Sequence, residues 1–153
     1  MPPTVRRRSE GDADALVAAL WPVHEHDGYP LHAVHVTRAW LYDGLDDAWV
    51  AVDDGRLLGH AALAHDDETT HLTRFFVARD ARGTGAGSAL LDVVEGWADE
   101  RDRTLALDVV EHNSEARALY ERRGWTHTGR VVATWVSESG PWPGADTYVR
   151  PPR

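Results

Sequence analysis

The order of apolar and polar positions predicts strands and helices that alternate along the whole chain. Apolar runs rich in β-branched and aromatic residues indicate strands, whereas apolar positions three and four residues apart indicate helices. The predicted strands are residues 4–8, 48–52, 57–64, 69–77, 104–110, 129–136 and 146–149. The predicted helices are residues 13–20, 36–42, 85–101 and 114–123.

Turn signals separate these elements and define the expected fold. Asp54-Gly55 between two apolar runs is typical of a tight hairpin, so the strands on either side should pair antiparallel. Pro22, Gly28 and Pro30 predict a loop over residues 21–31. The resulting order, β-α-α-β-β-β-α-β-α-β-β, indicates an α/β fold with a mixed, mostly antiparallel central sheet flanked by helices.

Length and composition are typical of one globular domain, which we expect over residues 1–153. The chain has 153 residues, of which 42% are hydrophobic and 27% are charged. No apolar run approaches the roughly 18 residues that a membrane span needs, and no apolar segment follows the arginines near the N-terminus. We therefore expect a cytoplasmic protein without a membrane partner.

Missing residue types and the net charge narrow the chemistry. The absence of cysteine excludes disulfides, thiolate metal sites and a cysteine nucleophile. All sixteen basic residues are arginine, so neither a Schiff-base lysine nor a Walker lysine is present. The formal net charge of −9 disfavours nucleic acid as a partner. The nine histidines include no H-E-x-x-H pair, and we predict no metal.

A glycine-rich segment, Arg82-Gly83-Thr84-Gly85-Ala86-Gly87, joins a predicted strand to the most regular predicted helix. Small residues let the backbone approach a ligand closely, and the free N–H groups at a helix N-terminus bind phosphate. A dinucleotide fingerprint is the alternative, with Asp108 as the ribose acid. That fingerprint lacks its third glycine, because Ser88 stands there, and Asp108 lies inside an apolar run.

Two motifs resemble those of the GNAT superfamily of N-acetyltransferases. Residues 82–87 fit the acetyl-CoA signature [QR]-x-x-G-x-[GA], which follows a strand that ends here at Val77. Residues 113–125 are similar to a later motif, N-x-x-A-x-x-[LF]-Y-x-[KR]-x-G-[FW], with Arg122 or Arg123 at the basic place. The family's usual proline after the strand is replaced by Arg79. The predicted order of elements matches the family over nearly the whole chain.

The resemblance implies an enzyme that transfers an acetyl group from acetyl-CoA to a primary amine, by direct attack in a ternary complex. The acceptor is a small molecule or a peptide, and the protein is a monomer or a homodimer. Polyamines, aminoglycosides, amino-acid derivatives and protein N-termini all stay open as acceptors. A non-catalytic domain that binds or senses acyl-CoA is the alternative.

The resemblance also implies roles for individual residues. The Val77 N–H would polarise the thioester carbonyl, exposed by a bulge or a splay of its strand. Tyr120 would be the general acid that protonates the departing thiolate. The residues expected to bind the cofactor are Phe75, Phe76, Val77, Arg82, Gly83, Thr84, Gly85, Ala86, Gly87, Ser88, Asn113, Ala116, Tyr120 and Arg123.

The general base and the acceptor side are less defined by the motifs. Glu68 and His71, just before and within the predicted strand 69–77, are the candidate bases. His26, Tyr29 and Trp135 are expected to flank the acceptor. The alternatives are a turn acid for Glu68, a surface or edge histidine for His71, and ordinary packing for the acceptor-side residues.

Overall fold

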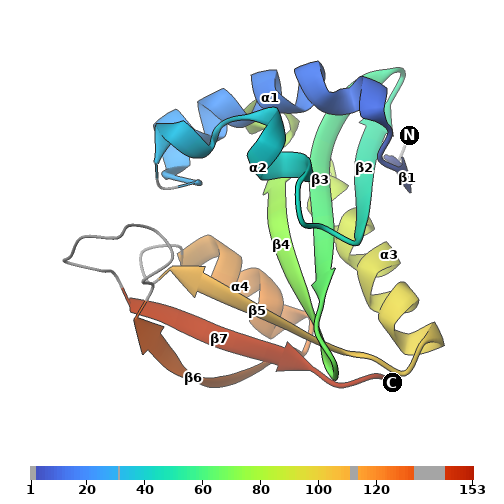
Figure 1. The fold of residues 1–153 in the computed structure, drawn as a ribbon, viewed down its shortest axis with the longest axis vertical. Helices are drawn as coiled ribbons and strands as arrows, with labels where there is room; N and C mark the ends of the chain where they lie inside the picture. The colour runs from blue at the N-terminus through green and yellow to red at the C-terminus, as the bar shows by residue number, and fades with distance from the viewer. Residues whose placement is uncertain (1–2, 31, 111–113, 133–143) are drawn as a thin grey trace.

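The described residues form a seven-stranded sheet in the order β1-β2-β3-β4-β5-β7-β6 (Figure 1). The structure is a computed structural model that describes residues 3–30, 32–110, 114–132 and 144–153, apart from the side chains of Val110 and Val132. The strands are β1 (Thr4–Arg7), β2 (Asp47–Asp53), β3 (Arg56–His65), β4 (Thr69–Val77), β5 (Thr104–Val110), β6 (Thr126–Val132) and β7 (Gly144–Arg150).

The pairing confirms the predicted mixed, mostly antiparallel sheet. β4 and β5 are parallel, and every other neighbouring pair is antiparallel. β2 and β3 form the hairpin predicted at Asp54-Gly55, where both turn residues have positive φ. β6 begins before the strand predicted at 129–136, whose last four residues lie outside the described part of the chain.

Helices cover both faces of the sheet and enclose two hydrophobic clusters. They are α1 (Ala13–Asp27), α2 (Arg38–Tyr42), α3 (Ala86–Glu100) and α4 (Ser114–Arg122). Side chains of β2 alternate between the faces, with Trp49 and Ala51 packing under α3 and Val50 packing under α1 and α2. The order of strands and α-helices agrees with the prediction.

The loop predicted over residues 21–31 was wrong over most of its length. α1 continues through Pro22 to Asp27, and Gly28 ends it in the left-handed conformation with φ 72°. A proline inside a helix removes one backbone hydrogen bond. The tertiary packing of Leu16, Leu20 and Val23 against the sheet outweighs that loss, because all three side chains are buried.

Arginine side chains form several of the ion pairs that connect helices and strands. Arg123, after α4, pairs with Glu95 of α3 at 2.9 Å, and Arg150 of β7 pairs with Asp99 of α3 at 2.8 Å. Both arginine side chains are largely buried, which strengthens these ion pairs relative to exposed ones. No helix within the described ranges has the length and hydrophobicity to span a membrane.

Candidate active site

β4 and β5 pair only over their first residues and then separate. The parallel register runs from Thr69 and Thr104 to His71 and Ala106. Beyond this point β5 continues against β7, and Figure 1 shows β4 and β5 diverging. The second half of β4 therefore keeps β3 as its one described neighbour. An extended ligand can add to such an open edge as a strand does.

The open half of β4 contains a bulge. The β3–β4 register shifts between His60 and Ala62, which places Arg74 and Phe75 opposite a single residue of β3. Arg74 has φ 51°, a conformation that costs a non-glycine residue roughly 1–2 kcal/mol. The structure thus contains both the bulge and the splay predicted for this strand.

The register turns the backbone of Val77 into the splay. Val77 lies opposite Gly59, and the next N–H, that of Ala78, donates to the Leu58 carbonyl at 2.8 Å. Because backbone groups alternate in an antiparallel ladder, the N–H and C=O of Val77 point away from β3. β5 does not pair with them. The Val77 N–H is accordingly directed toward the open side of β4.

The glycine segment leads from this point into α3. Gly83 and Gly85 have φ 81° and 88°, and Gly85 is the N-cap without a side-chain cap to the helix. The exposed loop therefore presents the first N–H groups of a 15-residue helix. These N–H groups and the helix dipole suit an anionic ligand such as a pyrophosphate.

Gly87 brings α3 close to the end of β4. A Cβ atom at Gly87 would lie 3.4 Å from Val77 Cγ2 and 3.7 Å from Phe75 Cζ. Both distances are ordinary van der Waals contacts, so α3 packs directly on the side chains at the end of β4. Thr84 fixes the loop by donating from Oγ1 to the Ala81 carbonyl at 2.6 Å. The phosphate-binding candidate and the open strand edge are therefore neighbours.

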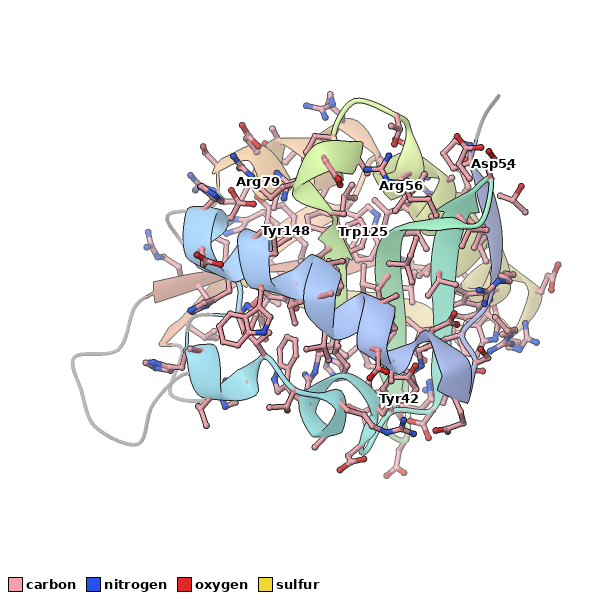
Figure 2. All side chains as sticks on the ribbon, turned by 90° about the horizontal axis from the view of Figure 1, so that it is seen from above. Tyr42, Asp54, Arg56, Arg79, Trp125 and Tyr148 are labelled. Carbon is pink, nitrogen blue, oxygen red and sulfur yellow. The ribbon has the colours of Figure 1, made fainter. Side chains whose placement is uncertain are left out.

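Asp27 joins the end of α1 to the loop that precedes α3. Its carboxylate accepts from Arg82 Nη2 at 2.6 Å and from Arg79 Nη1 at 3.0 Å. Figure 2 shows Arg79 beside the C-terminal end of α1. Arg82 also donates from Nε to the Val77 carbonyl at 3.2 Å. Sequence reasoning missed Asp27, because its partners lie more than fifty residues away and no local signal marks it.

Tyr120 lies on α4 within a group of aromatic rings. Its ring centroid is 6.3 Å from that of Phe75, 5.3 Å from that of Trp125 and 6.1 Å from that of Tyr148. Burial raises the pKa of Tyr120 well above its ordinary value, with Tyr29 as a smaller cause. The hydroxyl is therefore protonated across the working pH range.

Three other predicted cofactor residues have different surroundings. The Phe76 ring is buried on the α1 face of the sheet and stacks on His60. Ala116 is half-buried, one turn before Tyr120, and packs on the larger cluster. The Arg123 guanidinium is held by Glu95 and by Asp92, at 2.9 and 2.5 Å. These contacts give Arg123 a role between α3 and α4.

Of the residues predicted to flank the acceptor, the structure brings Tyr29 near the open part of β4 and leaves His26 on the surface. Tyr29 follows α1 and packs edge-on against Trp40 with ring centroids 5.8 Å apart. The pKa of Tyr29 is raised to about 12 by burial, against opposing effects of the Arg74 charge and the N–H groups of Arg74 and Phe75. Its hydroxyl therefore lies at the bulge. His26 is exposed on the last turn of α1.

Two predicted site residues, Asn113 and Trp135, lie outside the described residues. The base candidates lie at the other end of β4 from Val77. His71 precedes Val77 by six residues, about 20 Å at 3.3 Å per residue, and its Nε2 is 3.0 Å from Asp66 Oδ2. Glu68 is exposed in the turn before β4. The structure does not bring either side chain to the splay.

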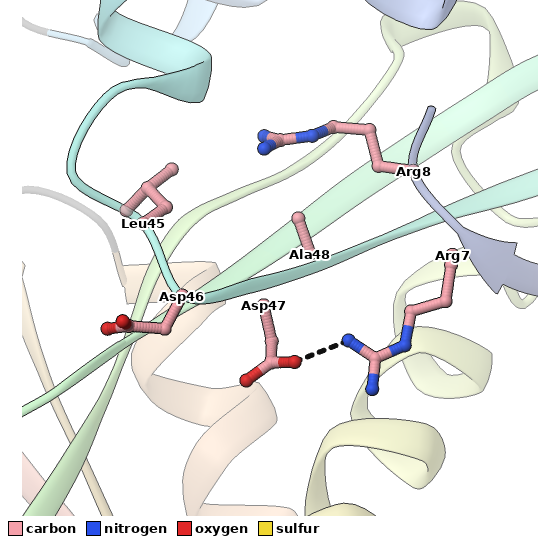
Figure 3. Close-up of a pocket in the computed structure, with 6 residues that line it drawn as sticks. All are labelled: Arg7, Arg8, Leu45, Asp46, Asp47 and Ala48. Atoms are coloured by element: carbon pink, nitrogen blue, oxygen red, sulfur yellow. Dashed lines mark hydrogen bonds and ion pairs between the residues drawn. The ribbon is translucent and has the colours of Figure 1, made fainter. Parts of the chain in front are cut away.

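Two hollows elsewhere on the described surface are lined largely by charged side chains. One lies at the start of β2, where Arg7 pairs with Asp47 at 2.5 Å while Arg8 extends over Ala48 (Figure 3). Another follows the Asp66 turn. Within the described ranges, no cluster of three or more histidine and acidic residues has a geometry that would hold a metal.

Comparison with known sequences identifies related proteins. A profile of the Acetyltransferase (GNAT) family matches residues 13–125. The chain is 34% identical over 97 residues to the 5-NmdU N-acetyltransferase of Pseudomonas phage PaMx11, covering 62% of this chain and 63% of that enzyme. It thus spans less than two thirds of that relative. It is 31% identical over 143 residues to aminoglycoside N(6')-acetyltransferase type 1 of Stenotrophomonas maltophilia, covering 85% and 90% of the two chains.

Comparison with solved structures finds the same fold. An N-acetyltransferase from Staphylococcus aureus Mu50 superposes with a TM-score of 0.76 over 99% of both chains, at 18% sequence identity. At this identity the similarity is one of architecture. It extends from the first strand to the last and includes the mixed sheet with helices on both faces.

Proposed function

Because this chain belongs to the GNAT family of acetyltransferases, we propose that it transfers the acetyl group of acetyl-CoA to a primary amine by direct attack in a ternary complex. The acetyl-CoA dependence is that of the family. The observation that carries the proposal is the open edge of β4 at Val77, which leads directly to the uncapped N-terminus of α3.

The residues around this edge are suited to the parts of acetyl-CoA. The N–H groups of residues 82–88 would bind the pyrophosphate, where Gly83 and Gly85 supply backbone conformations that side chains disfavour. The pantetheine arm would add to β4 through the backbone of Phe75 and Val77. Asp27 would keep Arg82 against the Val77 carbonyl, so that the loop and the strand end stay in register.

Acetyl-CoA supplies a thioester, whose carbonyl oxygen gains negative charge as an amine attacks. The Val77 N–H would donate a hydrogen bond to this oxygen and stabilise the charge. One such preorganised donor is worth roughly 10²–10³ in kcat. The bulge at Arg74 contributes by fixing the strand before the substrate arrives.

The Tyr120 hydroxyl would donate its hydrogen to the departing sulfur. A thiol has a pKa of about 8.5, below that of a tyrosine, and burial raises the pKa of Tyr120 further. We therefore expect hydrogen bonding to the thiolate to be the larger part of its role, with solvent replacing any proton that it gives. The raised pKa keeps the Tyr120 hydroxyl protonated at the start of each turnover.

The amine would approach from the side of Tyr29, where the end of α1 meets the bulge. Glu68 and His71 do not enter this mechanism, because His71 lies about 20 Å along β4 from Val77 and Glu68, in the turn before the strand, lies farther away. The amine would attack in its neutral form, and the proton released after attack would pass to solvent. 5-NmdU and an aminoglycoside are the first acceptor candidates, since two relatives are named for them.

The test begins with a calorimetric titration of acetyl-CoA into the purified protein, with NADH as the control ligand. Thiol release is then followed with a panel of kanamycin, spermidine, a nucleoside that carries a primary amine and a peptide with N-terminal alanine. Micromolar binding of acetyl-CoA alone, and thiol release with at least one amine, are expected. Binding without thiol release would favour a non-catalytic acyl-CoA-binding domain, and no binding would refute the cofactor site.

A further inference from the structure

His60 of β3 is a fully buried imidazole directly behind the bulge. Its exposed fraction is 0%, and its ring stacks on Phe76 with centroids 5.7 Å apart. A buried polar ring lowers stability unless its nitrogen atoms are hydrogen-bonded. Both nitrogen atoms of His60 have partners. The mechanism proposed above does not use this residue, and sequence reasoning did not select it.

Arg8 determines which nitrogen of His60 carries the proton. Arg8 Nη1 lies 3.1 Å from His60 Nε2, and a guanidinium can only donate. Nε2 is therefore the acceptor, and the neutral ring carries its hydrogen on Nδ1. Arg8 is itself held by the Leu41 carbonyl at 2.5 Å and by the Tyr42 ring, whose centroid is 3.7 Å away.

The Nδ1–H of His60 donates to the carbonyl of Arg74, at 2.7 Å. Arg74 is the bulge residue with φ 51°. Its side chain is also fixed, with Nε donating to the Trp40 carbonyl at 2.9 Å and the guanidinium 4.3 Å from the Trp40 ring centroid. A strained conformation persists only where the surroundings determine it. Here His60 holds the backbone, and Trp40 holds the side chain.

We propose that His60 is a positioning residue for acetyl transfer, whose ring, oriented by Arg8, holds the Arg74 carbonyl and thereby fixes the bulge that turns the Val77 N–H into the splay. The inference rests on the proposed function, because it assigns His60 to the oxyanion donor of that reaction. A displacement of about 1 Å at a reacting centre can lower the rate by about 10²-fold. One buried hydrogen bond at the bulge is therefore sufficient to change kcat.

Two amide substitutions separate the two contacts of the ring. The amide nitrogen of asparagine lies two bonds from Cβ, as Nδ1 of histidine does, so His60→Asn keeps a donor for the Arg74 carbonyl. The amide of glutamine lies three bonds from Cβ, as Nε2 does, so His60→Gln keeps a partner for Arg8 alone. His60→Leu removes both contacts. Leu63→Ala is the matched control, since it opens a cavity at a fully buried position of β3 that pairs with Leu72, outside the bulge.

The variants are compared by kcat with the best amine of the panel, by the acetyl-CoA Kd and by the melting temperature. We expect kcat within threefold of the unaltered protein for His60→Asn, and at least tenfold lower for His60→Leu and His60→Gln. The acetyl-CoA Kd should change less than threefold in all of them. Leu63→Ala should lower the melting temperature. At assay temperatures below that melting temperature, its kcat should equal that of the unaltered protein.

Three results would overturn the proposal. His60→Leu with unchanged kcat would show that the bulge does not need the ring. A kcat that follows the melting temperature across all variants would show a role in stability alone. Should His60→Leu fail to fold, equal kcat values for His60→Asn and His60→Gln would refute the proposed contact.

A measurement without turnover separates this inference from the proposed function. In nitrogen-15 spectra, the Phe75 and Val77 amide resonances should move further from those of the unaltered protein in His60→Gln than in His60→Asn, because both changes remove the ring that stacks on Phe76 and His60→Gln also removes the donor to the Arg74 carbonyl. If no amine of the panel is acetylated, the proposed function fails and these spectra still test the contact. Shifts in His60→Gln no larger than those in His60→Asn would refute it.

Discussion

Arg82 Nε donates to the Val77 carbonyl at 3.2 Å, which ties the glycine segment to the strand residue proposed as oxyanion donor. The same guanidinium donates from Nη2 to Asp27. The forked geometry of arginine allows both contacts at once, which a lysine at this position would not. Through this side chain the glycine segment, the end of β4 and the end of α1 form one connected unit.

Tyr120→Phe should lower kcat about tenfold to a hundredfold and leave the acetyl-CoA Kd within threefold, because the change removes a donor to the leaving sulfur and keeps the ring packing. Steady-state kinetics and calorimetry measure the two quantities. Since burial raises the pKa of Tyr120 above 10, its ionisation should cause no loss of kcat up to pH 10. Unchanged kcat in the variant would remove Tyr120 from the mechanism.

Gly85→Ala should raise the acetyl-CoA Kd at least fivefold, because a side chain at φ 88° strains the loop that presents the N–H groups. Gly44→Ala is the matched control, since Gly44 has φ 72° and precedes the start of β2, at the other end of the sheet from Val77. Both changes should lower the free energy of unfolding by about 1–2 kcal/mol. Calorimetry measures the acetyl-CoA Kd of each variant, and urea denaturation measures its free energy of unfolding. Equal acetyl-CoA Kd values for the two variants would contradict the proposal that this loop binds the cofactor.

Gly59→Ala should lower the free energy of unfolding by about 1–3 kcal/mol, because the new Cβ atom would lie 2.8 Å from the Phe76 carbonyl oxygen and 3.1 Å from Leu90 Cδ1. Gly96→Ala on α3 is the control, since its Cβ atom would meet nothing within 4 Å. That control should raise the free energy by about 0.5–1 kcal/mol. Urea denaturation measures the free energy of unfolding of both variants. An unchanged free energy of unfolding in Gly59→Ala would contradict the close approach of β3 and β4.

His60 should make stability depend on pH between about 4 and 6.5. Burial is the largest cause that lowers its pKa to about 4, helped by the charges of Arg8 and Arg74 and opposed by the Arg74 carbonyl and Asp12. The unfolded chain therefore binds more protons in this window, and stability falls as the pH falls through it. The loss is on the order of 3 kcal/mol and is absent above pH 6.5.

Urea denaturation at pH 7.5, 6 and 5 tests this dependence. His60→Asn removes the titrating ring and should show a smaller slope over the same range. The other histidines are common to both proteins, so they cancel in the comparison. Equal slopes for the two proteins would contradict the assignment.

Elements with local signals were predicted well from the sequence. The Asp54-Gly55 hairpin and the glycine segment before α3 both depend on residues adjacent in the chain. The length of α1 was underestimated, because Pro22 is a local helix breaker whereas the burial of Val23 is a tertiary effect. That packing depends on residues that are distant in the sequence, so the local pattern does not indicate it.

The parts of the site that were missed are those made by distant contacts. Nothing in the sequence marks Arg74 as a residue with positive φ, since the bulge is held by His60 and Trp40 from other elements. Asp27 likewise acquires its role from Arg79 and Arg82. Such residues are found once the fold has brought them together.

The reliance on arginine has a chemical consequence for a protein that we propose to use an acetyl thioester. Lysine amines are acylated slowly by such donors without any enzyme, whereas a protonated guanidinium is a poor nucleophile. The sequence contains no lysine, so the joints of Arg123 to Glu95 and Arg150 to Asp99 cannot be neutralised in this way. No side chain of these 153 residues offers the proposed donor an aliphatic amine, so prolonged exposure to that donor should leave the charges that join the helices to the sheet unaltered.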